Sequence, residues 1–492
     1  MIKPQSKLTF RVFLFLTLTL LVSANNAFAN EKKSQIENLV QKYNDYGKFT
    51  GSVLVSQSGK IIFKKSYGLA NMEWNIPNSP DTKFRIASLT KQFTSMLIMQ
   101  LVQDNKIKLD AKITAYIPDY RKDTGDKVTV HHLLTHTSGI PSYTSLPDFF
   151  SDISRDPYSV DDFTKKYCSG ELEFEPGSTF RYNNSGYFLL GNIIEKVTGK
   201  TYQDVLQEKI FTPLGMKNSG FDNAKPLIKN RASGYTNSLD GYTNANYLDM
   251  SLPYAAGSVY STVEDLYLWD QALYTEKLLN NKNKVIMFTP YLKNYSYGWG
   301  VKDIELTEPN HKIKSIAHSG GINGFQTLIT RLPQDQHMIV QLNNTGGAAL
   351  NEMTDAIIRI LYGEAFDEPK KSIVSVLYKT IKEKGIDSAI RLYHDLKESK
   401  SKSNEYEYEF AEHHLNNMGY QLLEINKVVE AIEIMKLNTI EHPESGNAYD
   451  SLGEAYLVND QKAQALKSYK KSLELEPDNK HAVTVIKEIE SK

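Results

Sequence analysis

The sequence contains a single cysteine, Cys168, and this scarcity excludes an intrachain disulfide. It also lacks an excess of either charge: the formal net charge is −1, which gives no indication of nucleic acid or an anionic membrane as a partner. Beyond residue 29 no apolar run approaches the length of a membrane span. With 492 residues, the chain is long enough for two or three domains and a sizeable core.

The first 29 residues have the pattern of a secretory signal. Three basic residues precede an apolar run over residues 12–22, and Ala27-Phe28-Ala29 is an A-x-A cleavage site. The run is short for a membrane span, and no cysteine follows it as a lipoprotein anchor requires. We expect an exported, periplasmic or secreted protein with no membrane span after cleavage and a net charge of about −4.

A serine and a lysine three residues apart stand at the head of a helical pattern. Apolar residues recur at helical spacing from Leu89 to Leu101. Positions i and i+3 share one helix face, so the Ser88 hydroxyl and the Lys91 amine can meet. A lysine with a lowered pKa can accept the proton of such a serine. Ser-x-x-Lys alone is a common pattern, and it also fits an amphipathic helix with a solvated lysine.

Strand patterns occur at both ends of the first 362 residues, with helical patterns between them. Residues 51–57 and 60–66 predict a hairpin about Ser58-Gly59. Three more strands are predicted between residues 313 and 342, and residues 210–216 are predicted to form a loop. We therefore expect an α+β fold in which one antiparallel sheet is assembled from both ends of the domain and flanked by helices.

Beyond residue 362 the chain carries an internal repeat. Three residues recur 34 positions later: Gly419, Ala431 and Pro443 return as Gly453, Ala465 and Pro477. This period is typical of tetratricopeptide repeats, which we predict over residues 405–492; a generic helical bundle is the alternative. Residues 363–404 are interpreted as a linker with a candidate divergent repeat. Such arrays usually present a groove, so we expect a protein or peptide partner.

His132 and His136 are spaced to bind a metal from one helix face. The glutamate that a zincin places between them is missing, and Gly139 and Pro141 end a helix soon afterwards. We interpret both histidines as structural, with a metal site as the alternative, and we expect neither a metal nor an organic cofactor.

Two further motifs join the Ser88 segment. Tyr182 and Asn184 form a Tyr-x-Asn pattern, and His318-Ser319-Gly320-Gly321 opens a β-rich region. In chain order these match the three motifs of the serine β-lactamase and penicillin-binding-protein superfamily. The resemblance covers roughly residues 37–361, and its tyrosine version resembles the class C branch. It implies a hydrolase domain over residues 30–362, with an all-helical subdomain beside the sheet.

The resemblance also implies roles. Ser88 would attack a carbonyl carbon, and either Lys91 or Tyr182, whose phenol pKa a neighbouring ammonium would lower, would be the base. Asn184 would contact the substrate carbonyl and Lys91, and the backbone N–H groups of Ser88 and Gly321 would form the oxyanion hole. The remaining substrate-binding residues would be His318, Ser319 and Gly320.

One departure from the family pattern affects the expected substrate. Class C β-lactamases carry lysine where this chain has His318, which we expect to be only partly charged near neutral pH. The sequence therefore predicts a serine hydrolase that acts on a small peptide amide or ester through an acyl-serine intermediate. The alternatives are a class C-like β-lactamase or D-Ala-D-Ala carboxypeptidase acting on peptidoglycan, and a catalytically weak scaffold that binds partners through its repeats.

Overall fold

The computed structural model describes residues 30–307, 312–398 and 408–491, so the predicted signal lies outside the described residues. Within these ranges the chain forms two compact units. The first comprises residues up to 236 together with 243–368, and the second comprises 237–242 and 369 onward. None of the helices in the described ranges is long and apolar enough to cross a bilayer.

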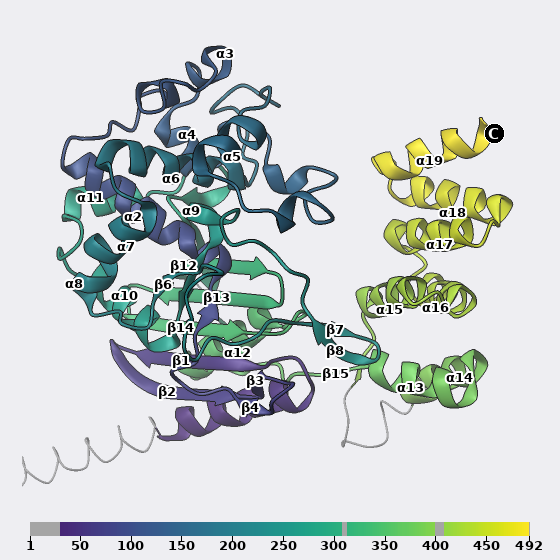
Figure 1. The fold of residues 1–492 in the computed structure, drawn as a ribbon. Coiled ribbons are helices and arrows are strands. Elements are labelled where there is room, and N and C mark those ends of the chain that lie inside the picture. Colours follow the sequence, from purple (N-terminus) through teal and green to yellow (C-terminus); the bar gives the residue numbers. More distant parts are fainter. Residues whose placement is uncertain (1–29, 308–311, 399–407, 492) are drawn as a thin grey trace, which may run out of the picture. The chain divides into compact units, whose positions relative to one another are not determined.

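A seven-stranded antiparallel sheet is the centre of the first unit (Figure 1). In spatial order its strands are β10 (Tyr295–Ser296), β11 (Trp299–Glu305), β12 (Lys312–Ile322), β13 (Phe325–Leu332), β14 (His337–Asn343), β1 (Gly51–Gln57) and β2 (Lys60–Tyr67). β1 pairs with β14 from Gly51 opposite Asn343 to Ser56 opposite Met338. The predicted sheet, built from both ends of the domain, is confirmed.

Both faces of the sheet are covered, because successive side chains of a strand point to opposite faces. Val53 packs in a core cluster with the helix over residues 30–45 and with α12 (Leu350–Tyr362). The next residue, Leu54, belongs to the larger cluster on the other face, which includes α2 (Thr90–Gln103). The strands in the middle of the sheet, β13, β14 and β1, are therefore buried along almost their whole length.

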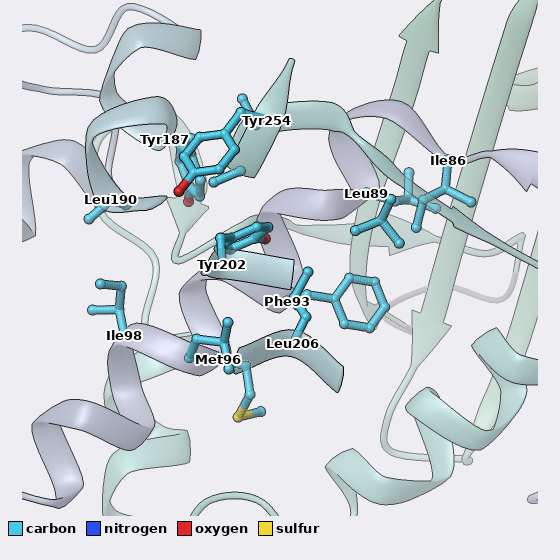
Figure 2. Packing of buried hydrophobic residues seen from close by; sticks show 14 of the residues in the cluster. Ile86, Leu89, Phe93, Met96, Ile98, Tyr187, Leu190, Tyr202, Leu206 and Tyr254 are labelled. Carbon is cyan, nitrogen blue, oxygen red and sulfur yellow. The ribbon is translucent and has the colours of Figure 1, made fainter. Parts of the chain in front are cut away.

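The larger cluster continues into a group of helices around α2. Figure 2 shows Phe93 and Met96 of α2 among side chains of α7 (Tyr202–Leu206). The neighbouring α6 (Asn184–Thr198) begins at the cap Asn183 and ends at Gly199. Further α-helices of this unit include α4 (Val130–Leu134), α5 (Val160–Tyr167), α9 (Tyr254–Gly257), α10 (Val263–Leu273) and α11 (Asn281–Phe288).

The prediction of a loop over residues 210–216 is wrong. Helix α7 runs on through a π-helical turn, Gln207–Phe211, into α8 (Thr212–Leu214), and only Gly215, with φ +71°, ends it. Ile210 and Phe211 are buried, and a π turn inserts one extra residue that brings both onto the core face. Pro213 stands in the first turn of α8, directly after the π turn.

The second unit is helical. After residue 369 its helices are α13 (Val374–Lys384), α14 (Ile386–Glu398), α15 (Glu412–Glu424), α16 (Val428–Glu441), α17 (Gly446–Val458), α18 (Lys462–Leu475) and α19 (Lys480–Glu490). A Cβ added to Gly419 would lie 2.6 Å from Met435, and one added to Gly453 would lie 3.0 Å from the Tyr469 ring. Glycine thus permits the close approach of α15 to α16 and of α17 to α18.

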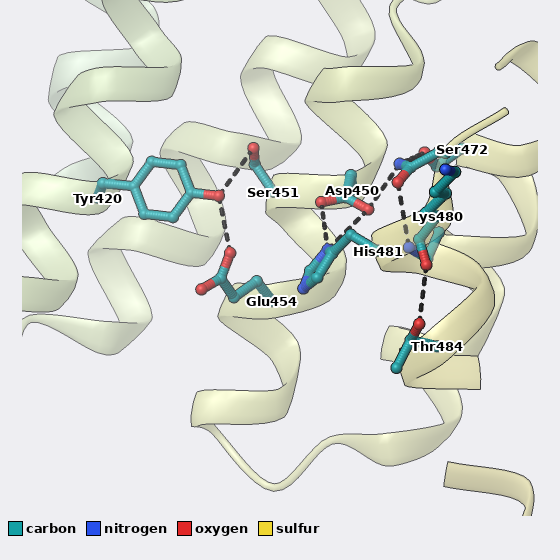
Figure 3. A network of polar contacts seen from close by, with 10 residues as sticks. Tyr420, Asp450, Ser451, Glu454, Ser472, Lys480, His481 and Thr484 are labelled. Atoms are coloured by element: carbon teal, nitrogen blue, oxygen red, sulfur yellow. Dashed lines mark hydrogen bonds and ion pairs between the residues drawn. The ribbon is translucent and has the colours of Figure 1, made fainter. Parts of the chain in front are cut away.

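Polar side chains link helices that do not follow one another in the sequence (Figure 3). The Tyr420 hydroxyl on α15 donates to Glu454 on α17 over 2.8 Å. His481 Nδ1 on α19 lies 3.0 Å from a carboxylate oxygen of Asp450, also on α17. Hydrogen bonds of this kind fix the register between stacked helix pairs.

Candidate active site

Ser88 lies in a single 3₁₀ turn directly before α2. The preceding residue, Ala87, has φ +49°, a backbone conformation that costs a non-glycine residue on the order of 1 kcal/mol. The Ile86 carbonyl accepts a hydrogen bond of 2.9 Å from Thr327 on β13. On β12, a Cβ added to Gly320 would lie 2.4 Å from the same carbonyl oxygen. Two strands therefore hold the turn, and one of them needs a glycine to approach it.

Lys91 is completely buried beside Ser88. Its Nζ lies 3.0 Å from Ser88 Oγ, 2.9 Å from Asn184 Oδ1 and 2.9 Å from the Ala256 carbonyl oxygen. It also lies 4.9 Å from the centre of the Tyr182 ring. Burial lowers the pKa of Lys91 well below its ordinary value of 10.5.

The three contacts of Lys91 match the valences of a neutral amine. Such an amine has two N–H donors and one lone pair. Asn184 Oδ1 and the Ala256 carbonyl can only accept, whereas the Ser88 hydroxyl can donate. An ammonium would donate to all three oxygens, whereas in the neutral form, which burial favours, the amine lone pair is left for the Ser88 proton.

The Tyr-x-Asn motif forms the entry to α6. The Asn183 side chain accepts from the Gly186 N–H over 2.7 Å, which caps the helix. Asn184 is thereby directed at Lys91, and its Nδ2 donates to Thr144 Oγ1 over 3.1 Å. The predicted contact between Asn184 and Lys91 is present, and one N–H of the Asn184 amide is left for a ligand.

The expected lowering of the Tyr182 phenol pKa is wrong. The side chain as a whole is 38% exposed, but its hydroxyl lies deep among protein atoms, and this burial raises the pKa of Tyr182 above its ordinary value of 10.0. A hydrogen bond with Ser88 opposes the shift only in part. The His136 ring lies against Tyr182, with centroids 4.3 Å apart and planes tilted by 39°, and His136 Nδ1 accepts from the Asn183 N–H over 3.0 Å.

The expected partial charge of His318 is also wrong. His318 is buried, with Nδ1 2.6 Å from the Ser319 carbonyl oxygen and Nε2 2.9 Å from the Tyr295 hydroxyl. Burial, and the Lys91 side chain when it carries a proton, lower the pKa of His318 to about 3. The imidazole is therefore neutral at physiological pH.

A cavity of about 320 Å³ opens at Ser88. Ser88, Asn184 and Gly321 all contribute to its wall, so the two residues predicted to supply the oxyanion hole line the same space. The rest of the lining consists of Ala87, Tyr143, Thr144, Phe149, Phe150, Leu248, Pro253, Ala256, Gly257, Ile322 and Asn323. None of these lining residues has a charged side chain.

Several residues around the site escaped the sequence reasoning. Tyr295 contacts His318, and the Ala256 carbonyl contacts Lys91. The partners of each contact are far apart in the sequence, so no local pattern predicts it. His132 has a local role instead: it completes a capping box with Thr129 at the start of α4, as its structural interpretation predicts. Cys168 is buried in the core cluster of α2, and burial raises the pKa of its thiol.

Known proteins resemble this chain in sequence. A family model described as Beta-lactamase matches residues 36–362. Penicillin-binding protein 4* of Bacillus subtilis (strain 168) is 29% identical over 386 residues, which are 73% of this chain and 81% of that protein. Protein flp of Staphylococcus aureus (strain MW2) is 28% identical over 333 residues, and the match spans 64% of each protein.

Two solved structures have the same fold. The penicillin binding protein from Bacillus halodurans is 30% identical, with a TM-score of 0.59, and the match covers 65% of this chain and 98% of that chain. D-amino acid amidase from Ochrobactrum anthropi SV3, complexed with D-phenylalanine, is 26% identical, with a TM-score of 0.59 and coverage of 68% and 99%.

Proposed function

The chain belongs to the beta-lactamase family and is a serine hydrolase, and we propose that it is an exported enzyme of the class C type that cleaves a peptide amide or an ester. One observation carries the proposal. The Lys91 amine, buried beside the uncharged Asn184 and Ala256 oxygens, lies 3.0 Å from the Ser88 hydroxyl. A serine becomes a nucleophile when a base at this distance removes its proton.

In the acylation step, Ser88 Oγ attacks the substrate carbonyl carbon while its proton moves to Lys91 Nζ. The carbonyl oxygen becomes an oxyanion, which the N–H groups of Ser88 and Gly321 stabilise. Collapse of this intermediate expels the amine or alcohol, which takes up a proton from the Lys91 ammonium. The products of this step are the free leaving group and an ester of Ser88.

In the deacylation step, a water molecule attacks the Ser88 ester. The neutral Lys91 amine accepts a proton from the water, and returns it to Ser88 Oγ as the acid leaves. Tyr182 takes part as a neutral phenol that donates a hydrogen bond, because its raised pKa opposes a phenolate. Asn184 holds Lys91 and offers its remaining N–H to the substrate carbonyl.

Two features support the substrate class. D-amino acid amidase, at 26% identity, acts on an amide according to its name. The neutral His318 stands where class C β-lactamases carry a permanent cation. Both favour amides and esters over carboxylate-bearing β-lactams.

For the second unit we propose tetratricopeptide repeats over residues 405–492, preceded by a linker and a divergent repeat over 363–404. The 34-residue spacing of Gly419 and Gly453, each facing the next helix, supports this proposal. The repeats would bind a protein or peptide partner, while residues 30–362 form the hydrolase domain.

The proposal is tested by the intact mass of the protein after incubation with a fluorophosphonate and, separately, with a penicillin. We expect one fluorophosphonate adduct on the wild type and none on Ser88→Ala. A persistent penicillin adduct, also lost in Ser88→Ala, would favour a penicillin-binding peptidase. Two of the similar proteins carry the name penicillin-binding protein. No adduct from either probe on folded protein would contradict the hydrolase and favour the scaffold.

A further inference from the structure

His318 has no polar atom left for a substrate. The Ser319 carbonyl oxygen, 2.6 Å from Nδ1, can only accept, so Nδ1 carries the proton. In this neutral tautomer Nε2 can only accept, and it lies 2.9 Å from the Tyr295 hydroxyl, which therefore donates to it. Both ring nitrogens are satisfied within the protein, and neither offers a cation or an N–H group to the cavity.

From this arrangement we infer that Tyr295 is a specificity-determining residue: it holds His318 in its neutral Nδ1–H form, so that the site selects substrates whose leaving group carries no carboxylate. The inference rests on the proposed hydrolase function and defines its substrate class. An amidated peptide or a simple ester would be hydrolysed, and a peptide ending in a free carboxylate next to the scissile bond would be disfavoured.

The cavity provides no substitute for the missing cation. The side chains that line it beside Ser88 are uncharged, and Phe149, Leu248 and Ile322 make part of its wall apolar. A carboxylate transferred from water into such surroundings loses hydration without gaining an ion pair. The same wall suits an apolar acyl group. The preferred substrate is therefore uncharged both in its acyl group and in its leaving group.

The titratable groups around His318 and Tyr295 oppose a charge on the imidazole. The Lys91 amine and the His136 imidazole interact electrostatically with His318, and the Tyr182 ring lies 6.1 Å from it between centroids. Tyr187 faces the Tyr295 hydroxyl. Burial and Lys91 both lower the pKa of His318, in agreement with the tautomer that the hydrogen bonds require.

The test compares one scissile bond with two leaving groups. N-acetyl-phenylalanyl-alanine and its C-terminal amide, in the D and the L series, are assayed at pH 7 with the full chain. We expect kcat/KM for the amide to exceed that for the free acid by about tenfold or more, the penalty for an unpaired carboxylate. In Tyr295→Phe the ratio of kcat/KM for the amide to kcat/KM for the acid should fall by about threefold or more, because His318 Nε2 loses the hydroxyl that donates to it.

Tyr297→Phe is the matched control. Tyr297 makes an equivalent contact, 2.8 Å from His131 Nδ1, but this pair does not include His318 or the cavity lining. Loss of the Tyr297 hydroxyl should leave the amide-to-acid ratio of kcat/KM unchanged. Imidazole ¹⁵N shifts in histidine-labelled protein supply a readout independent of turnover: His318 should be a neutral Nδ1–H tautomer at pH 7 in the wild type.

Three results would overturn the inference: equal or better cleavage of the free acid, a doubly protonated His318 at pH 7, or an equal change of the ratio in Tyr297→Phe. If Ser88 reacts with the fluorophosphonate but neither peptide is cleaved, the two compounds are compared as competitors of that labelling, with the same expected preference. If Ser88 is not labelled at all, the proposed function fails, and the ¹⁵N spectrum still decides the state of His318.

Discussion

A completely buried lysine whose contacts are all uncharged is rare in proteins, because burial disfavours the ammonium form. Lys91 tolerates this position because two acceptors and one hydroxyl satisfy a neutral amine. The surrounding backbone is strained to present them: Ala87 precedes Ser88 with φ +49°, and Tyr254 starts α9, which carries the Ala256 carbonyl, with φ +38°. Strain of this kind persists where neighbouring elements enforce it.

Replacing His318 by lysine should introduce the cation that the site lacks. The Tyr295 hydroxyl, which now donates to His318, can accept from an ammonium instead. We expect His318→Lys to increase the turnover of a carboxylate-bearing β-lactam at least modestly, about threefold or more. Nitrocefin hydrolysis measures this, with Ser88→Ala as the blank. No change, or a loss of turnover in a folded variant, would contradict our explanation of the histidine.

At the scale of elements, β12 positions the nucleophile through a glycine. A Cβ at Gly320 would lie 2.4 Å from both the Ile86 carbonyl oxygen and Thr327 Oγ1, whereas a Cβ at the neighbouring Gly321 would meet open space. We expect Gly320→Ala to destabilise the fold by about 1–3 kcal/mol and to reduce kcat/KM about tenfold or more by displacing the Ser88 turn. Urea denaturation and ester hydrolysis measure the two effects.

Gly321→Ala is the control for this prediction. Its Cβ has no neighbour within 4 Å, so its free energy of unfolding should stay within about 0.5 kcal/mol of the wild type. If both variants were equally stable, the close approach of β12 to the Ser88 turn would not require a glycine.

The sequence predicted these elements where a local pattern determines them. The hairpin turn at Ser58 and Gly59 has φ +49° and +71°, the two positive values that a two-residue type I′ turn requires. Helix α6 ends at Gly199, and β13 and β14 lie within two residues of their predicted bounds. The loop predicted over residues 210–216 failed because burial of Ile210 and Phe211 outweighed the turn signal.

The site was predictable where short sequence motifs determine its contacts. The i, i+3 spacing of Ser88 and Lys91 predicts their contact, the family resemblance implies the contact of Asn184 with Lys91, and both contacts are present. The charge states of Tyr182 and His318 depend on burial and on Tyr295, which tertiary packing alone brings to His318. Residue types indicate which groups meet, but the environment decides whether they are ionised.

At the scale of the whole molecule, the buried and half-buried histidines of the first unit should make it sensitive to acid. The pKa of His318 is lowered to about 3, that of His132 to about 4, and that of His136 well below 6.5. Between these values and about 6.5 the unfolded chain binds protons that the folded chain does not, so stability falls as pH falls. Each such group contributes about 1 kcal/mol per pH unit.

We therefore expect the free energy of unfolding of the first unit to decrease between pH 7 and pH 5. Tryptophan fluorescence reports this unit selectively, because Trp74, Trp269 and Trp299 all lie within it. His318→Gln should show a shallower decrease, since it removes one of the groups. An unfolding midpoint in urea that is independent of pH over this range would contradict the neutral, buried state of these histidines.

The central claim is that a neutral Lys91 activates Ser88. The most direct measurement is the rate at which a fluorophosphonate labels Ser88 between pH 5 and pH 10, in the wild type, Lys91→Met and Tyr182→Phe. We predict that the wild-type rate falls as Lys91 becomes protonated, at a pH below its ordinary pKa of 10.5. Lys91→Met should lower the rate by about 10²–10⁴-fold and abolish this pH dependence, and Tyr182→Phe should preserve it. Labelling of Lys91→Met at the wild-type rate, or loss of the pH dependence in Tyr182→Phe alone, would contradict the account.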